Sequence, residues 1–192
     1  MCGVVGFIAK EKEEQTVEKM LSVQSYRGPD DRGVFVEQIG DSYVHLGHNR
    51  LSIQDLSSHG HQPFVSDCGN YIIVFNGEVY NFKTIREELE KLGYAFVSES
   101  DTEVILYAYK AWGLECLEKF IGMFAFSILD KRENKMFLVR DRAGVKPLYY
   151  YDNGNTFLFA SELKSFYEHP AFEKELNKEI LPYYFQFGYI PA

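Results

Sequence analysis

Residues 71–75 form a run of five consecutive apolar side chains, and this run constrains the fold more than any other stretch of the chain. Successive side chains of a strand point to opposite faces of the sheet, so a strand without a polar residue has both faces covered. The run therefore predicts a fully buried strand in a layered protein. We expect the strand to end at the dipeptide Asn76-Gly77, which is typical of a turn.

The rest of the sequence contains helical segments and paired strands. Apolar residues recur at helical spacing in three segments, and apolar runs joined by short polar turns predict hairpins rather than regular β-α-β units. Together these patterns predict an antiparallel α+β layered fold. The predicted helices cover residues 13–26, 82–92 (with Asn81 as N-cap) and 101–112 (with a capping box of Ser100 and Glu103), the predicted hairpins cover residues 33–50, 123–139 and 148–160, and residues 51–70 are a long polar loop.

Composition and charge argue against several classes of protein. The chain has 192 residues, 46% of them apolar, which suits one large domain with its own core. A net charge of −8, with acidic and basic residues interleaved, argues against nucleic acid as a partner. No run of 18 apolar residues occurs, so we expect no association with a membrane. Three cysteines, an odd number, without a preceding secretory segment favour the reducing cytoplasm.

Cys2 is the first candidate for chemistry. Removal of Met1 would leave a thiol beside a free α-amine, whose reference pKa of about 7.7 to 8.0 suits it to act as the base for this nucleophile. Apolar residues at positions 4–8 predict that the terminus is held in a buried strand. The alternative is an ordinary second residue without a role. Cys68 and Cys116 are expected to be inert.

The dipeptide Asn76-Gly77 is the second candidate. A side-chain amide and a backbone N–H could together donate hydrogen bonds to the oxyanion that forms during acyl transfer. The alternative is a hairpin turn, for which Asn-Gly is a strong signal. Glu78-Val79-Tyr80-Asn81 leads into a predicted helix rather than a returning strand, which weakens the turn interpretation.

Arg50, Glu78 and Asp101 complete the set of candidate binding residues. An arginine at the end of a strand with apolar neighbours can hold a carboxylate through two hydrogen bonds, and the two acids can hold an ammonium. The alternatives are a solvated arginine, an exposed Glu78, and an Asp101 that only stabilises the first turn of its helix. With Cys2 and the Asn76-Gly77 donors, these groups describe an amino acid with a side-chain amide as the substrate.

Five ordered motifs carry a resemblance to a known family. The chain resembles the class II glutamine amidotransferase domain, in particular that of glutamine-hydrolysing asparagine synthetases, and the similarity covers nearly its whole length. The resemblance implies an N-terminal-nucleophile (Ntn) hydrolase fold, a four-layer αββα sandwich of two stacked antiparallel sheets flanked by helices. The motifs are Met1-Cys2-Gly3, Arg27-Gly28-Pro29-Asp30, Arg50-Leu51-Ser52-Ile53, Asn76-Gly77-Glu78-Val79-Tyr80-Asn81 and Ser100-Asp101-Thr102-Glu103-Val104, with further similarity over residues 122–126 and 140–150.

The same resemblance implies an activity and the residues that carry it. The family hydrolyses L-glutamine to L-glutamate and ammonia through a thioester on the N-terminal cysteine. The resemblance implies the following roles: Cys2 as nucleophile, Asn76 and Gly77 as oxyanion donors, and Arg50, Leu51, Ile53, Glu78 and Asp101 as glutamine-binding residues.

The resemblance also implies a domain organisation. Residues 1–192 are expected to be one glutaminase domain, and an ATP-dependent synthetase domain acting on aspartate is expected to lie outside this chain. ATP and Mg²⁺ would belong to that domain, so we expect no cofactor or metal here. The aromatic stretch 181–192 is expected to face this partner domain, with self-packing as the alternative. A homodimer stays open.

Three other functions stay open at this point. The chain could supply ammonia to a different ammonia-using synthetase, or it could be a non-catalytic assembly domain of the same fold. A metal site is the third alternative, and it would use His45, His48, His59 and His61.

Overall fold

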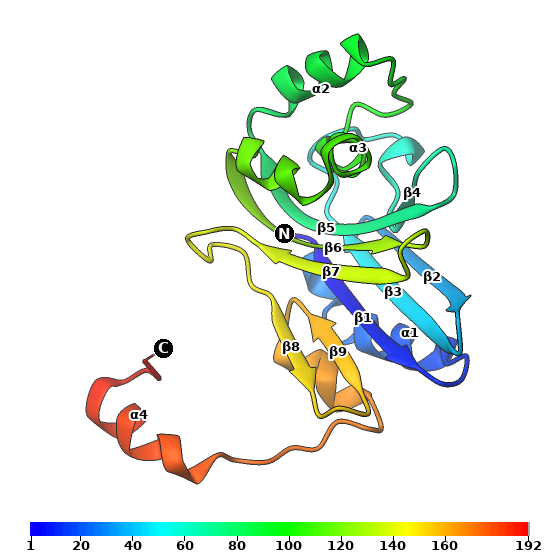
Figure 1. Cartoon of the computed structure of the whole chain (residues 1–192). Coiled ribbons are helices and arrows are strands. Elements are labelled where there is room, and N and C mark those ends of the chain that lie inside the picture. Colours follow the sequence, from blue (N-terminus) through cyan, green and yellow to red (C-terminus); the bar gives the residue numbers. More distant parts are fainter. Residues whose placement is uncertain (192) are drawn as a thin grey trace.

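Two antiparallel sheets stacked face to face form the centre of the structure, a computed structural model that describes residues 1–191 (Figure 1). The first sheet has the strand order β2-β3-β1-β9-β8 and the second the order β4-β5-β6-β7. The strands of the first sheet are β1 (Gly3–Ala9), β2 (Asp31–Ile39), β3 (Ser42–Arg50), β8 (Tyr149–Asp152) and β9 (Phe157–Ala160). Those of the second are β4 (Phe64–Val65), β5 (Tyr71–Val79), β6 (Gly122–Asp130) and β7 (Lys135–Arg140).

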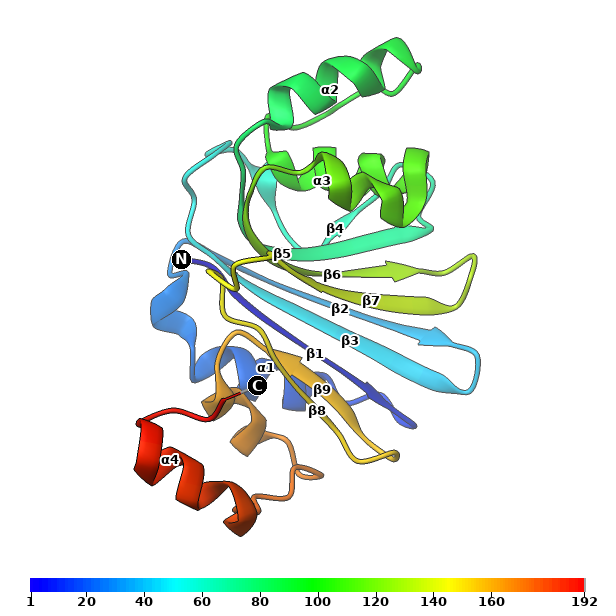
Figure 2. The ribbon, with the colours of Figure 1, turned by 60° about the vertical axis from the view of Figure 1, so that its left-hand side comes forward.

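Helices cover the outer face of each sheet, which gives four layers (Figure 2). Helix α1 packs on β1 and β3, whereas α3 lies on the second sheet with α2 against it. The predicted αββα sandwich is therefore confirmed. The α-helices are α1 (Glu14–Ser22), α2 (Phe82–Lys91), α3 (Asp101–Trp112) and α4 (Leu181–Phe187), and short 3-10 turns are η1 (Ser25–Arg27), η2 (Ser58–Gly60), η3 (Gly113–Lys119), η4 (Leu163–Glu168) and η5 (Lys178–Ile180).

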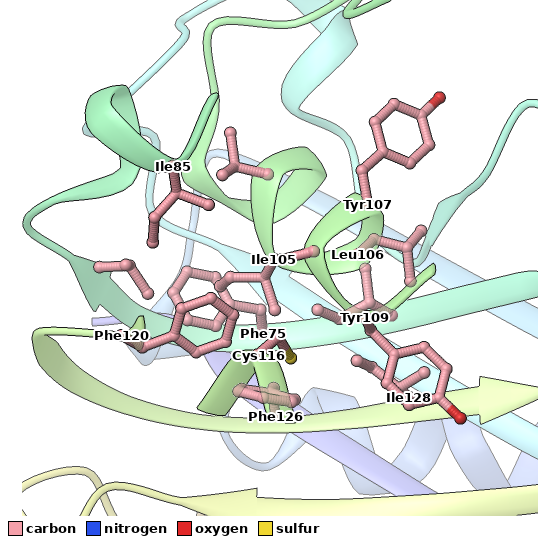
Figure 3. Close-up of a cluster of buried hydrophobic side chains, with 14 of the residues drawn as sticks. Phe75, Ile85, Ile105, Leu106, Tyr107, Tyr109, Cys116, Phe120, Phe126 and Ile128 are labelled. Atoms are coloured by element: carbon pink, nitrogen blue, oxygen red, sulfur yellow. The ribbon is translucent and has the colours of Figure 1, made fainter. Parts of the chain in front are cut away.

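Strand β5 is buried on both faces, as its apolar run predicts. Ile73 and Phe75 join the cluster formed with α2 and α3, in which Ile85, Ile105 and Phe120 also lie (Figure 3). On the opposite face, Ile72 and Val74 belong to a cluster with Val4 of β1, Leu46 of β3 and Phe159 of β9. One face of β5 thus meets helices, and the other meets the first sheet.

The prediction that this strand ends at Asn76-Gly77 is wrong, and so is the turn alternative. Strand β5 continues to Val79, and Gly77 lies opposite Phe124 of β6. The strand continues because β6 offers a partner along its whole length and because Gly77 has no side chain. A Cβ atom at Gly77 would lie 2.3 Å from the carbonyl oxygen of Met123.

The first predicted helix, at residues 13–26, is too long. Helix α1 ends at Ser22, and the chain turns through η1 before Gly28. The side-chain amide of Asn49 donates to the carbonyl oxygen of Leu21 at 2.8 Å, and the amide of Gln24 donates to the carbonyl of Val4 at 3.2 Å. These contacts with β1 and β3 take the place of further helical turns.

The capping predictions for α2 and α3 are half right. Ser100 caps α3 through the N–H of Thr102, but Glu103 accepts hydrogen bonds from Val97 and Ser98 instead of the N–H of Ser100. Asn81 precedes α2, yet its side chain gives no cap, because it is bonded to the backbone of residues 119 and 121. The three predicted hairpins correspond to β2-β3, β6-β7 and β8-β9 and are confirmed.

The two ends of the chain differ in their packing. Strand β1 lies in the middle of the first sheet, between β3 and β9, so the predicted anchoring of the N-terminal strand is confirmed. Helix α4 has no buried residue, and its tyrosine and phenylalanine side chains are exposed. None of the helices formed by residues 1–191 is long and apolar enough to cross a bilayer.

The burial of both faces of β5 predicts that two neighbouring substitutions are equally damaging. Ile72→Ala removes contacts between the sheets, and Ile73→Ala removes contacts with the helices, so we expect each to lower the free energy of unfolding by about 2–5 kcal/mol. Val97→Ala, at a side chain that is 66% exposed, is the control, with an expected change within about 0.5 kcal/mol. Urea titration measures all three. A small change at either isoleucine would contradict the double-sided burial.

Candidate active site

A cavity of about 270 Å³ opens where the first strand of one sheet meets the end of β5 in the other. Both sheets, α3 and the loop after β3 contribute to its wall. All eight residues that the sequence singled out as candidates line it: Cys2, Arg50, Leu51, Ile53, Asn76, Gly77, Glu78 and Asp101.

Cys2 enters this cavity directly before β1. Its Sγ atom lies 3.4 Å from the backbone nitrogen of Leu51, which donates to it, and 3.7 Å from the carbonyl oxygen of the same residue. Burial raises the pKa of the Cys2 thiol, although the N–H of Leu51 and nearby positive charges partly oppose this effect. The thiol is therefore protonated at neutral pH and needs a base to act as a nucleophile.

The side chain of Asn76 points from the second sheet toward the first. Because side chains alternate along a strand, Asn76 shares the face of β5 that carries Ile72 and Val74, which contact the first sheet. Asn76 is only 1% exposed, yet its Nδ2 atom has no hydrogen-bond partner among residues 1–191. A buried unpaired donor costs about 1–3 kcal/mol, so this amide is prepared for an acceptor that enters the cavity.

The backbone N–H of Gly77 points to the same cavity. Phe124 of β6 lies opposite Gly77, but both of its backbone polar groups bond to Asp141. Gly77 and Phe124 therefore exchange no hydrogen bonds, and the backbone N–H of Gly77 points away from β6. The N–H groups two residues on either side face the same way. That of Phe75 donates to Gln62 at 2.7 Å, and that of Val79 donates to Asp101 at 3.0 Å. Gly77 therefore presents a donor between two that are already paired.

Arg50, the last residue of β3, is buried and not a solvated surface arginine. Its guanidinium donates to the carbonyl oxygens of Ser57, at 3.0 Å, of Gln54, at 3.3 Å, and of Asp55. These bonds hold the loop after β3 around the side chain. A guanidinium has five N–H donors, and two of those of Arg50 form no hydrogen bond with residues 1–191, so they are candidates for binding a ligand.

Asp101 and Glu78 place two acids on one wall. Asp101 is buried at the start of α3, and this burial raises the pKa of its carboxyl group to about 6, with the negative charge of Glu78 adding to the effect. The alternative in which Asp101 only stabilises its helix does not account for this burial. Glu78 is half-buried rather than exposed. Two adjacent acids form a site suited to a cation.

Leu51 and Ile53 lie at different depths. Leu51 is half-buried and holds the thiol through its backbone, whereas Ile53 is 65% exposed at the edge of the cavity. Leu51 therefore shapes the inner wall, and Ile53 shapes only the rim.

Comparison with known proteins identifies the family. A family model described as a glutamine amidotransferase domain matches residues 1–192. The chain belongs to this family. A putative glutamine-hydrolysing asparagine synthetase 2 of Methanocaldococcus jannaschii is 40% identical over 210 residues, covering 100% of this chain and 40% of the relative. Asparagine synthetase 3 of Bacillus subtilis is 38% identical over 194 residues, covering 98% of this chain and 31% of the relative.

Solved structures agree on the fold. Glutamine phosphoribosylpyrophosphate amidotransferase of B. subtilis superposes with a TM-score of 0.72 at 23% identity, over 86% of this chain and 43% of the other. The amidotransferase domain thus has the Ntn-hydrolase architecture. It spans less than half the length of the relatives named above.

Four of the residues around the candidate active site that were assigned no role from sequence form contacts there or line the cavity. Arg27 donates to the carbonyl oxygen of Cys2 at 2.9 Å, and Gln62 bridges Phe75 and Thr102. Met123 and Lys146 line the cavity. Arg27, Met123 and Lys146 all lie in motifs that carry the resemblance, which is the signal that could have found them. Gln62 lies in the polar loop and has no such signal.

The alternative metal site lacks support in the amidotransferase domain. Within residues 1–191, no three His, Cys, Asp or Glu side chains are grouped so that they could hold a metal ion. His48 bonds to the carbonyl oxygen of Phe75, and His45 accepts from the N–H of Glu13.

Neither of the other two cysteines, Cys68 and Cys116, lines the candidate active-site cavity. Burial raises the pKa of Cys116 to about 12, in agreement with an inert thiol, whereas Cys68 is exposed.

The buried carboxylate of Asp101 predicts a gain in stability when it is neutralised. Its folded-state pKa of about 6 lies above the ordinary 3.8, so ionisation destabilises the fold increasingly as the pH rises through this interval. We expect Asp101→Asn to raise the free energy of unfolding at pH 7.5 by about 1–3 kcal/mol and to change it little at pH 4. Urea titrations at the two pH values measure the difference. A less stable variant at pH 7.5 would contradict the prediction.

Proposed function

We propose that this domain hydrolyses L-glutamine to L-glutamate and ammonia, with Cys2 as the nucleophile. The observation that carries the proposal is the buried, unpaired amide of Asn76, which lines the same cavity as the Cys2 thiol and the Gly77 N–H. Acyl transfer passes through an oxyanion, and unpaired hydrogen-bond donors beside the nucleophilic thiol can stabilise it. Membership of the amidotransferase family and the names of its relatives support glutamine as the acyl donor.

The mechanism begins once Met1 has been removed. The α-amine of Cys2 takes the proton of the thiol, and the sulfur bonds to the side-chain carbonyl carbon of glutamine while an electron pair moves onto the oxygen. Asn76 and Gly77 stabilise this oxyanion. Collapse of the adduct breaks the carbon–nitrogen bond, and the leaving nitrogen takes the proton from the α-ammonium and departs as ammonia.

Water completes the reaction. It loses a proton to the α-amine as its oxygen attacks the thioester carbon, and a second oxyanion forms between the same donors. The carbon–sulfur bond then breaks, glutamate is released, and the thiolate of Cys2 recovers the proton. The raised pKa of the Cys2 thiol explains why a base on the same residue is useful.

The remaining groups of the cavity account for binding. In this proposal, the remaining N–H donors of Arg50 hold the α-carboxylate, and Asp101 with Glu78 holds the α-ammonium; all three residues line the cavity. Leu51 forms the inner wall, and Ile53 covers the rim. A glutamine bound in this way is held at both charged groups, and its amide is left to face Cys2.

The domain also fits a larger enzyme. We propose that residues 1–192 form one glutaminase domain of a longer cytoplasmic protein that uses the ammonia to make asparagine from aspartate in a further, ATP-dependent domain. ATP and Mg²⁺ would bind there, and we propose no cofactor for the glutaminase reaction. The names and lengths of the relatives and the unbonded state of the three cysteines support this proposal. The exposed aromatic side chains of α4 suit contact with that domain.

Substitutions of the nucleophile and the oxyanion donor test the glutaminase proposal. We expect Cys2→Ala to lower kcat for glutamate release by at least about a thousandfold and Asn76→Ala to lower it about 10²- to 10³-fold. Cys68→Ala, at an exposed thiol outside the cavity, is the matched control and should keep the parent rate. Parent activity in Cys2→Ala would refute the mechanism. A folded parent without activity would instead favour a non-catalytic assembly domain.

The pKa of Asp101 predicts a pH dependence of substrate binding. A carboxyl group must be ionised to pair with the ammonium of glutamine, and this one becomes protonated as the pH falls through about 6. We expect KM for glutamine to be constant above about pH 7 and to rise about tenfold per unit well below pH 6. In Asp101→Asn, KM should be high and independent of pH over this range. Initial rates at pH 5 to 8 measure both, and a parent KM that does not change would contradict the assignment.

A further inference from the structure

We propose that Glu162, at the end of the first sheet, is a positioning residue for the N-terminal nucleophile and acts through Arg27. The inference rests on the proposed function, because it assigns Glu162 a part in glutamine hydrolysis. Glu162 itself does not line the active-site cavity.

Arg27 connects Glu162 to Cys2 with a single guanidinium. Its Nη1 atom lies 3.0 Å from Oε1 of Glu162, and its Nε atom donates to the carbonyl oxygen of Cys2 at 2.9 Å. Since the guanidinium is planar and rigid, the position of the carboxylate sets the direction of the bond to Cys2. The side chains of Arg27 and Glu162 are only 8% and 21% exposed, so water screens this ion pair weakly.

Glu162 is itself held from three sides. Besides Arg27, the hydroxyl of Tyr26 donates to Oε1, and Nζ of Lys164 lies 3.2 Å from Oε2. Partial burial alone would raise the pKa of Glu162, but these contacts outweigh burial and keep the pKa below its usual value. Glu162 is therefore a fixed anion at neutral pH rather than a mobile surface acid.

The residue before Glu162 fixes the same end of β1. The backbone N–H of Ser161 donates to the carbonyl oxygen of Val4 at 2.9 Å, and its hydroxyl accepts from the N–H of Val4 at 3.0 Å. The dipeptide Ser161-Glu162 therefore holds Val4 directly and Cys2 through Arg27. Gln24 and Arg27 contact the same two positions from the other side, since the amide of Gln24 donates to the carbonyl oxygen of Val4 at 3.2 Å and Arg27 donates to that of Cys2.

The nucleophile needs this support because it precedes the first strand. Strand β1 pairs with its neighbours only from Gly3 onward, and Cys2 would become a terminal residue once Met1 is removed. Its carbonyl bond to Arg27 orients the peptide that joins it to Gly3. The thiol and the α-amine are both attached to the Cα atom that precedes this peptide. The hydrogen bond from Arg27 therefore helps to set their position relative to the substrate amide. Displacement by about 1 Å can lower a rate about 10²-fold.

The glutamine-binding groups lie elsewhere, which separates positioning from binding. Arg50, Glu78 and Asp101 have no hydrogen bond to Glu162 or Arg27, so loss of Glu162 should alter kcat far more than KM. A loosened terminus should also leave the Cys2 thiol more exposed. The thiol would then react faster with a small alkylating agent while it turns over glutamine more slowly.

The test compares Glu162→Ala and Glu162→Gln with the parent. Glu90→Ala is the matched control, because it breaks the Arg86–Glu90 pair on the surface, which does not contact the active site. Kinetics are measured well below the melting temperature of each variant. Peptide mass spectrometry then gives the rates at which iodoacetamide alkylates Cys2 and Cys68, and the exposed Cys68 serves as the reference in each sample.

We expect Glu162→Ala to lower kcat at least about tenfold, to change KM less than about threefold, and to raise the Cys2 to Cys68 alkylation ratio at least about threefold. Glu162→Gln keeps an acceptor for Arg27 and should recover most of kcat and the parent ratio. Glu90→Ala should match the parent in all three quantities.

An unchanged kcat and an unchanged alkylation ratio in Glu162→Ala would overturn the inference, as would a loss of kcat that Gln does not reverse. If Glu162→Ala fails to fold, Glu162→Gln decides alone: a kcat more than about tenfold below the parent overturns the inference, and a kcat near the parent supports it. A parent without glutaminase activity would refute the proposed function, and the alkylation ratios of the folded variants would still decide the inference.

Discussion

The antiparallel pairing of β1 with β3 and β9 is the constraint on which the rest of the site depends. A chain terminus normally frays, because its first residues lack partners on both sides. Here the strand that follows Cys2 lies in the middle of a sheet. The register pairs Gly3 with Asn49, so Cys2 lies beside Arg50 and Leu51 at the end of β3. The hydrogen bonds that anchor the terminus therefore also bring the thiol to a wall of the cavity.

The stacking of the sheets supplies the opposite wall. Side-chain alternation along β5 aims Ile72 and Val74 at the first sheet, and the same alternation aims Asn76 and Glu78 in that direction two and four residues later. The first part of β5 is wholly apolar and belongs to the core, and its last residues line the cavity, although the strand geometry is the same along its length.

Most buried charged groups around the site are paired, and one unpaired donor is informative. Arg27 has Glu162 and the carbonyl of Cys2, Arg50 has backbone carbonyls, and Asp101 has the N–H of Val79. These contacts offset the cost of removing charges from water. The amide of Asn76 has no partner for its nitrogen among the described residues. The unpaired donor destabilises the fold, and a ligand oxygen that accepts its hydrogen bond would remove this destabilisation.

Much of this was predictable from sequence, because it depends on neighbouring residues. The apolar run at 71–75, the three hairpins and the existence of α1, α2 and α3 follow from local patterns, and the order of the motifs identifies the family. The predictions that failed are element boundaries and two side-chain caps, those of Asn81 and Glu103. The end of β5 and the end of α1 are decided by partners elsewhere in the chain, namely β6 and the side chain of Asn49.

The sequence by itself determined which residue types could form a nucleophile, an oxyanion site and a charged binding site. Only the tertiary structure decided that all eight candidates line one cavity, that the amide of Asn76 is left unpaired, and that Glu162 reaches Cys2 through Arg27. The physical reason is sequence distance. Arg27 and Glu162 are 135 positions apart, and Val4 and Ser161 are 157 apart. Strand pairing and sheet stacking bring such residues together, and no local pattern records these contacts.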